Sequence, residues 1–267
     1  MKTIRTAWCI LTVLVLSDAF AHEFWLMPER FLLRVGDRVK FSLSVGENFT
    51  GEPWDVRKSR IVWLKHFFGK KSTDLLPAVQ EGDTGGVSLR FESEGTHLLA
   101  FKNDNKFIEL KAAEFTAYLK EDGLDNALES RARNGQSAKP GRELYSRCVK
   151  SLVQVGSQPD DTHARLVGDR LEILPERNPY ALRETDSLTV RVIFDQRPLA
   201  NALVRVWHRQ NGKAKVEAWR SNADGKVSFG LVRRGRWMVS VVRMVPYPDP
   251  KQADWQSFWG NLTFGYE

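Results

Sequence analysis

The chain has 267 residues and a formal net charge of +7, with 42% of its residues hydrophobic and 27% charged. This is the composition of a globular protein that is long enough to bury a core, as one large or two modest domains. The basic residues are scattered and form no dense block, which argues against a nucleic-acid partner.

Residues 1–21 have the layout of a secretory signal peptide. A basic start is followed by an apolar run, and Ala19-Phe20-Ala21 fits the rule for a cleavage site. The run is short for a membrane-spanning helix, and no second long apolar stretch follows it. We therefore predict an exported, periplasmic chain that begins at His22 and contains no transmembrane segment.

Residues 22–111 are expected to form short antiparallel strands. In RVKFSLSVG, Val39, Phe41 and Leu43 alternate with polar residues, which is the period of a half-buried strand. The segments RIVWLKHF, GGVSLRFES and GTHLLAFK are further strand candidates, and turn residues separate them. This spacing predicts an N-terminal β-sandwich.

Residues 112–167 are expected to form a helical connector. The segment AAEFTAYLKEDGL places Phe115, Tyr118 and Leu119 on one helical face, and DNALESRARNG fits a second short helix. A third helix is expected over residues 142–155, after a polar break. The connector would join the N-terminal sandwich to a second β unit.

Cys148 lies in the third predicted helix. It recurs there at helical spacing with Leu144, Leu152 and Val155, so we expect it on an apolar face. It is the only cysteine after residue 21, which excludes an internal disulfide. A thiol in such a position is a packing residue, and no catalytic cysteine is expected.

Residues 168–267 are again expected to be β. Alternation of apolar and polar residues runs through LTVRVIF, ALVRVWHRQ, AKVEAWR, KVSFG and RWMVSVVRM. Asn211-Gly212 and Asp224-Gly225 predict tight hairpins. The whole chain is therefore expected to be mainly β, with two antiparallel β-sandwiches joined by a short helical block.

One face of the second β unit carries aromatic and basic side chains. By alternation, Arg205, Trp207, Arg209 and Trp219 fall on the side opposite the predicted core. They could form a surface for a glycan or protein partner. The alternative is that this face packs against the helical block or the first sandwich, and we favour it because exported proteins rarely leave such a face open.

Several segments resemble a bacterial periplasmic family of unknown function, whose members are often labelled NikM-like components of nickel or cobalt uptake. These segments are AHEFWLMPERF, EFTAYLKEDGLDNALESRARNG, LEILPERNPYALRETDSLTVRVIFDQRPLANALVRVW and ADWQSFWGNLTF. The stretch from NALVRVWHRQ to GRWMVSVV is also similar to transthyretin-like and carboxypeptidase regulatory-like sandwiches. The resemblance implies a C-terminal Ig-like or transthyretin-like sandwich and, as a partner, a membrane component of metal uptake.

His22 is the leading candidate for a metal ligand. After cleavage it would carry an α-amine, whose pKa is about 7.7–8.0, beside its imidazole. Two nitrogens from one residue make a chelate that suits Cu(II) or Ni(II). The further ligands expected are His66 and His97, which fall in the same predicted sandwich, although no short histidine spacing marks a local metal motif.

The simpler alternative for His22 is an exposed chain end without a ligand. His163 is expected in a solvated loop and His208 as a part-buried strand residue. In the resembling family a histidine commonly precedes the methionine of the last long strand, and Arg243 stands at that position here. If that histidine is a family ligand, this chain lacks it.

The chain contains no nucleophile elbow, zinc-protease motif or phosphate-binding loop, so no enzyme is predicted. The leading hypothesis is a non-enzymatic periplasmic protein that binds a nickel, cobalt or copper ion through His22, His66 and His97. The alternative is an envelope structural or interaction module that binds a protein or polysaccharide through the face of Trp207 and Trp219.

Overall fold

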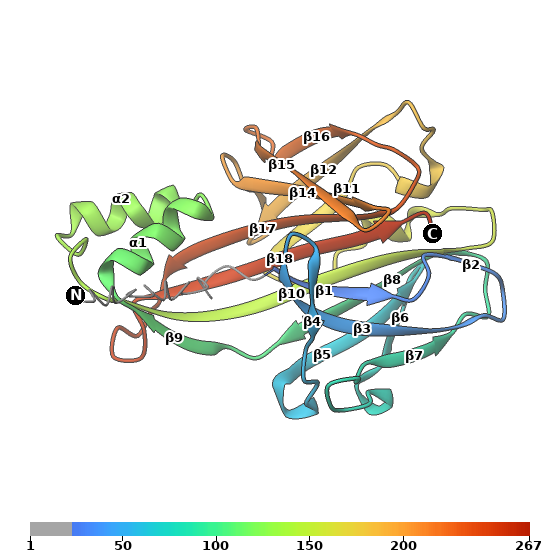
Figure 1. Cartoon of the computed structure of the whole chain (residues 1–267), viewed down its shortest axis with the longest axis horizontal. Helices are drawn as coiled ribbons and strands as arrows, with labels where there is room; N and C mark the ends of the chain where they lie inside the picture. Colours follow the sequence, from blue (N-terminus) through green and yellow to red (C-terminus); the bar gives the residue numbers. More distant parts are fainter. Residues whose placement is uncertain (1–22) are drawn as a thin grey trace, which may run out of the picture.

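The computed structural model describes residues 23–267, which are mainly β (Figure 1), so the predicted fold class is confirmed. Two four-stranded sheets flank a larger one. The N-terminal sheet contains β1 (Glu23–Pro28), β3 (Arg38–Glu47), β4 (Thr50–Pro53) and β7 (Val87–Arg90). The C-terminal sheet contains β11 (Leu171–Pro175), β12 (Ser187–Phe194), β13 (Arg197–Pro198) and β16 (Lys226–Gly230).

The larger sheet has ten strands. Its main order is β15-β14-β17-β18-β10-β8-β5-β6, and β2 and β9 also pair with β10. These strands are β2 (Leu32–Leu33), β5 (Ile61–Phe68), β6 (Lys71–Asp74), β8 (Gly95–Asn103), β9 (Lys106–Leu110), β10 (Gly141–Val155), β14 (Leu203–Gln210), β15 (Lys213–Arg220), β17 (Arg236–Pro246) and β18 (Trp255–Gly265).

The ten-stranded sheet is the middle layer of the molecule. Along β8, Leu98 and Ala100 belong to a core shared with the C-terminal sheet, whereas Leu99 and Phe101 belong to a core shared with the N-terminal sheet. Successive side chains of a strand point to opposite faces. The two small sheets therefore cover opposite faces of the middle sheet, above and below the long strands in Figure 1.

The two sandwiches share this middle sheet because β10 and β18 pair in parallel. Their register runs from Glu143 opposite Trp255 to Ser151 opposite Thr263. Strands β8, β5 and β6 continue the sheet on one side of this pair, and β17, β14 and β15 continue it on the other. A parallel pair joins segments that lie far apart in the sequence, and here it fuses two units that the sequence predicted as separate sandwiches.

The predicted helix over residues 142–155 is wrong, because this segment is β10. Leu144, Cys148 and Leu152 are spaced four residues apart, which fits a helical face but also fits one face of a strand. The deciding feature is burial on both faces toward the C-terminal half of β10, where Val149 and Val153 face one core and Leu152 faces the other. A strand buried on both faces loses its alternating pattern.

The other two predicted helices are present as α1 (Ala112–Glu121) and α2 (Asp125–Arg133). Phe115, Tyr118 and Leu119 of α1 are buried, as the helical spacing predicted. They pack on Val242 and Met244 of β17, on the same face of the middle sheet that the N-terminal sheet covers. Four short 3-10 turns complete the regular structure: Lys58–Arg60, Leu76–Ala78, Asp161–Ala164 and Pro179–Ala181.

One of the two predicted hairpin turns is confirmed and the other is wrong. Asn211 and Gly212 have positive φ angles of 50° and 73° and join β14 to its neighbour β15. Asp224 and Gly225 also form a turn, but it leads from β15 in the middle sheet to β16 in the C-terminal sheet. An Asp-Gly turn can therefore connect strands of two different sheets as well as neighbouring strands of one hairpin.

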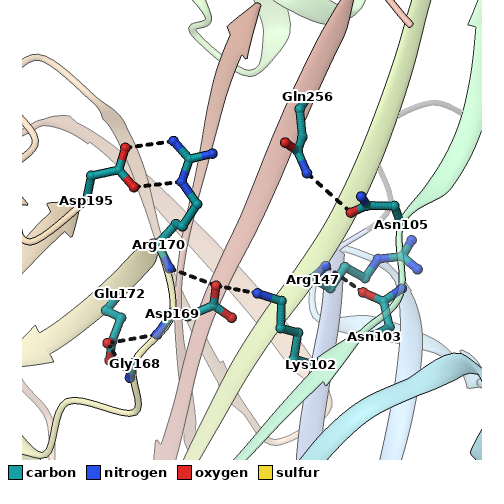
Figure 2. A network of polar contacts seen from close by, with 10 residues as sticks. All are labelled: Lys102, Asn103, Asn105, Arg147, Gly168, Asp169, Arg170, Glu172, Asp195 and Gln256. Carbon is teal, nitrogen blue, oxygen red and sulfur yellow. Dashed lines mark hydrogen bonds and ion pairs between the residues drawn. The ribbon is translucent and has the colours of Figure 1, made fainter. Parts of the chain in front are cut away.

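A polar network joins β8 to the start of the C-terminal sheet (Figure 2). Asp169 accepts hydrogen bonds from Lys102 Nζ at 2.9 Å and from the backbone N–H of Arg170 at 2.8 Å. The Arg170 side chain binds both carboxylate oxygens of Asp195 at 2.6 and 2.7 Å. Nearby, Cys148 is buried, and burial raises the pKa of its thiol well above the usual value, as expected of a packing residue.

Among residues 23–267, no helix has the length and apolar character needed to cross a lipid bilayer.

Candidate functional site

A cavity of about 570 Å³ lies beside the first strand, on the face of the middle sheet that α1 covers. Glu23 of β1 and Trp207 and Arg205 of β14 line it, together with Glu114 and Glu121 of α1. Its lining thus contains several carboxylates and few cations. A hollow of this size is in the range of small-ligand sites.

Glu23 is the most buried of the carboxyl groups that line this cavity. It is 7% exposed, and Ser240 Oγ of β17 donates a hydrogen bond of 2.7 Å to its Oε1. Burial raises the pKa of Glu23 to about 7; the hydrogen bond from Ser240 opposes this rise, and the charge of Asp122 adds to it. The first described strand therefore begins at a fixed point in the cavity wall.

Arg205 connects the floor of the cavity to α1. Its Nη1 donates to Asp122 Oδ1 at 2.6 Å, and its Nη2 donates to the carbonyl oxygen of Glu121 at 2.6 Å. Burial raises the pKa of Asp122 to about 6, and the attraction of Arg205 limits the rise. The guanidinium is thus engaged in holding the C-terminal end of α1 on β14.

The aromatic and basic face predicted for the second β unit is mostly covered, which is the alternative that the sequence favoured. Trp207 is 7% exposed and packs with Trp25 and Phe49 of the N-terminal part. Arg209 Nη1 donates to the carbonyl oxygen of Phe49 at 2.9 Å. The prediction that Trp219 shares this face is wrong. Trp219 stands opposite Val204, which belongs to the core on the other face of the middle sheet, and 43% of it remains exposed.

Glu143 is a second buried carboxyl under α1, and the sequence reasoning missed it. It is 2% exposed and accepts hydrogen bonds from Tyr118 at 3.1 Å and from Ser257. Burial raises its pKa to about 7, while the hydrogen bonds from Ser257 and Tyr118 lower it. The residue was placed in a helix by its spacing, and a lone glutamate in the sequence gives no sign of such burial.

His66 and His97 are brought together, as their common sandwich suggested. His66 Nε2 lies 2.8 Å from His97 Nδ1, and His97 Nε2 lies 3.0 Å from the carbonyl oxygen of Ser93. A carbonyl only accepts, so His97 donates through Nε2 and receives the N–H of His66 at Nδ1. This assignment leaves the Nδ1 lone pair of His66 without a role inside the pair.

Aromatic rings enclose the two histidines. The ring of Phe68 stacks on His97 at 4.2 Å, and the ring of Phe91 meets His97 edge-on at 4.9 Å. Burial lowers the pKa of His66 to about 4, with a further contribution from His97, and burial also lowers the pKa of His97. Both rings are therefore neutral at pH 7, which is the form that binds metal ions.

The histidine pair lies well away from the start of β1. Phe24 contacts Phe101 of β8, with ring centroids 5.6 Å apart. His97 lies four residues before Phe101 in β8, a distance of about 13 Å along the strand. Glu23 binds to β17, which is three strands from β8 in the sheet, or about 14 Å. His22 lies outside the described residues, so the three-histidine site stays a prediction.

The described residues contain no group of three or more His, Cys, Asp or Glu side chains arranged to hold a metal ion. His208 stacks on Trp237 at 4.1 Å and is part-buried, as predicted. His163 is 8% exposed in a 3-10 turn, so the prediction of a solvated loop is wrong. Arg243 lies over the ring of Phe194, on the opposite face of the middle sheet from the cavity.

A family model described as a domain of unknown function (DUF4198) matches residues 19–244. No curated protein matches the chain significantly. These 226 matched positions include β1, both helices, β10 and most of the C-terminal sandwich.

Solved structures give looser matches. A DUF4785 family protein from Legionella pneumophila is 11% identical and aligns over 81% of this chain and 51% of its own, with a TM-score of 0.27. A tetra-tandem repeat of a large adhesion protein is 11% identical over 92% and 50%, with a TM-score of 0.22. The chain thus spans about half the length of these two proteins. An Escherichia coli alpha-2-macroglobulin activated by porcine elastase is 14% identical over 92% and 22%, with a TM-score of 0.20.

Proposed function

The chain belongs to the family described as domain of unknown function DUF4198, and we propose that it is an exported, non-enzymatic binding protein of the periplasm. In this proposal its processed N-terminus, His22, binds a nickel, cobalt or copper ion. The resemblance of several segments to NikM-like proteins supports a role beside a membrane component of metal uptake.

The observation that carries the proposal is the position of Glu23. This residue follows the predicted first residue of the mature chain, and it is buried in the wall of the cavity by its hydrogen bond with Ser240. A chain that begins at His22 therefore starts one residue from a rigid anchor. An anchored end loses less conformational entropy when it binds an ion than a free end does.

The chemistry of the cavity is consistent with a cation. The α-amine and the imidazole of His22 supply two nitrogen ligands, and Glu114 and Glu121 lie in the lining of the same cavity as Glu23. Carboxylate groups attract a divalent ion and can complete its coordination. Because the start of β1 is far from His66 and His97, the oxygen ligands of the cavity are the nearer partners for His22.

Isothermal titration of the processed protein with Ni(II), Co(II) and Cu(II) tests the proposal. The matched control is the same chain with its α-amine acetylated, which removes the amine ligand and leaves the imidazole of His22 in place. We expect the natural N-terminus to bind at least one of these ions at least tenfold more tightly than the acetylated form, because the acetylated form has lost the amine ligand.

A second variant, His66→Gln, separates the two histidine locations. If the N-terminus is the site, this variant binds the ion as the natural chain does. Equal affinity of the natural and acetylated chains would contradict the proposal. Loss of binding in the His66→Gln variant alone would move the site to the histidine pair.

The second candidate function is an envelope interaction module. The aromatic and arginine face first considered for it is covered at Trp207, Arg205 and Arg209. On β15, Val216 and Trp219 point to opposite faces of the sheet and are exposed by 46% and 43%. Recovery of a stoichiometric envelope partner that survives a chelator would favour this function over metal capture.

A further inference from the structure

Strand β15 is the last strand of the ten-stranded sheet, at the upper side of the molecule in Figure 1. Within residues 23–267, no strand pairs with its outer edge. Nearly all of its residues are exposed, and two of them, Val216 and Trp219, are large and apolar. Proteins usually protect a long edge strand, so an open edge with exposed apolar side chains indicates a pairing surface.

The backbone groups of alternate residues in β15 point to this open edge. At the start of β15, Lys213 pairs with Gln210 of β14 across the two-residue turn. Just after its end, the N–H of Ser221 donates to the C=O of Ala202 at 3.0 Å, and the C=O of Ser221 accepts from the N–H of Asn201 at 2.9 Å, so both groups point toward β14. Along an antiparallel strand, residues alternate between the two edges. The N–H and C=O groups of Ala214, Val216 and Ala218 therefore face outward.

The side chains of β15 alternate between the two faces of the sheet. Lys215 and Glu217 stand opposite His208 and Val206 of β14, and they share one face with Lys213 and Trp219. Val216 stands opposite Trp207 on the other face. Residues at equal distances on either side of Val216 are complementary: Lys215 corresponds to Glu217, and Lys213 corresponds to Trp219. The two alanines, at 214 and 218, also correspond to each other.

We propose that the chain forms a homodimer in which β15 pairs antiparallel with β15 of a second copy, about a two-fold axis that passes through Val216. Such an axis requires residues on the same face to stand opposite one another. In this register Val216 faces Val216 of the partner subunit, and Lys215 faces Glu217 of the partner subunit. Lys213 then faces Trp219 of the partner subunit, which suits a cation–π contact.

The charges of the strand select this register over its neighbours. A shift that places the axis at Glu217 sets two carboxylates against each other, and a shift that places it at Lys215 sets two ammonium groups against each other. Like charges directly opposite each other are unfavourable, and opposite charges are favourable. Lys215 and Glu217 also occupy the positions whose backbone groups face β14, where side chains across the new pair come closest.

The interface would be small. About six backbone hydrogen bonds would form, two at Val216 and four between Ala214 and Ala218 of the two subunits. Paired strands of this length bury less area than a standard interface, so the dimer is expected to dissociate in the micromolar range. It would join two ten-stranded sheets into one continuous sheet, and it does not depend on a metal ion.

Sedimentation velocity of the processed chain across a range of concentrations tests the proposal. The Lys215→Glu and Glu217→Lys variants each place like charges opposite one another twice, and we expect each to weaken the dimer about tenfold or more. The double variant with both exchanges restores opposite charges and should restore the dimer. Glu52→Lys, an equally exposed exchange on the distant strand β4, is the control and should leave association unchanged.

A disulfide gives an independent measure of the register. Hydrogen-bonded residues opposite each other have Cα atoms about 5.5 Å apart, which is the spacing that a disulfide needs. We expect a Val216→Cys variant to form a covalent dimer under mild oxidation, whereas Lys213→Cys, which faces Trp219 of the partner subunit, should not. The buried Cys148 does not compete.

Three results would overturn the proposal. The first is a monomer at all concentrations without a Val216→Cys cross-link. The second is a dimer that the double exchange does not restore. The third is growth into open oligomers, which would indicate head-to-tail pairing of β15 with the opposite edge of the sheet.

Discussion

The buried carboxyl of Glu143 makes a sharp test of how α1 is held on the sheet. Glu143 of β10 accepts hydrogen bonds from Tyr118 of α1 and Ser257 of β18 through the same oxygen, Oε1. Its other oxygen, Oε2, is buried without a hydrogen-bond partner among the described residues. The change Glu143→Gln keeps the accepting oxygen and the size of the side chain but removes the possibility of ionisation.

The pH dependence follows from the raised pKa. Burial raises the pKa of Glu143 from 4.5 to about 7, so the folded chain holds this proton more tightly than the unfolded chain does. The stability that this proton contributes is complete below pH 4.5 and is lost as pH rises through 7. Each tenfold change in proton affinity is worth about 1.4 kcal/mol, so the loss between pH 5 and pH 8 is about 2 to 3 kcal/mol.

Urea unfolding at pH 5 and pH 8 measures this loss. We expect the free energy of unfolding of the natural chain to fall more between the two values than that of the Glu143→Gln variant, by about 2 to 3 kcal/mol. At pH 5 the two proteins should be similar, because the protonated carboxyl and the amide make the same contacts. Glu23 and Asp122 add a dependence of the same sign to both proteins and cancel in the comparison.

The control is an exposed carboxylate, Glu52→Gln on β4, which should follow the natural chain at both pH values. If Glu143→Gln and the natural chain lose the same stability between pH 5 and pH 8, Glu143 is already ionised in the fold. The account of the contact between α1 and the sheet would then be wrong.

Two further predictions concern the other face of β10. Lys150 donates to Glu172, and both side chains are almost fully buried. The change Lys150→Met should leave the Glu172 carboxylate unpaired and lower the free energy of unfolding, measured in urea, by about 3 to 5 kcal/mol. A loss below 1 kcal/mol would show that the backbone N–H groups bound to Glu172 are enough to stabilise its charge. Cys148 should react with a thiol reagent at least a hundredfold more slowly in the native protein than in urea, because it is buried and its pKa is raised. Similar reaction rates in the two states would mean that β10 opens readily in the native protein.

The local elements were predictable where the sequence pattern has a single period. Strands such as β3 and β12 have alternation that only an extended chain satisfies, and α1 has a helical face that only a helix satisfies. Strand β10 was mistaken for a helix because its apolar residues are four apart, a spacing common to both structures. The choice between them was made by neighbours, β18 and β8, that lie far away in the sequence.

The candidate sites show the same division. The sequence identified His66 and His97 as belonging to one sandwich, but their contact through Nε2 and Nδ1 depends on the pairing of β5 with β8. The cavity beside Glu23 was not predictable, because β1, α1 and β14 meet there from distant parts of the chain.

The sequence by itself determined that this chain is mainly β, that segments such as β3 and β12 are strands, that α1 and α2 are helices, and that its one cysteine after residue 21 is a packing residue. These features depend on contacts between near neighbours and on the two periods of 2 and 3.6 residues. Only the tertiary structure decided that the two sandwiches share one sheet and that the carboxyl groups of Glu23, Asp122 and Glu143 are buried around α1. It also decided that Trp207 is covered while the outer edge of β15 is open. Those outcomes depend on which distant surfaces exclude water together, and no local pattern records that.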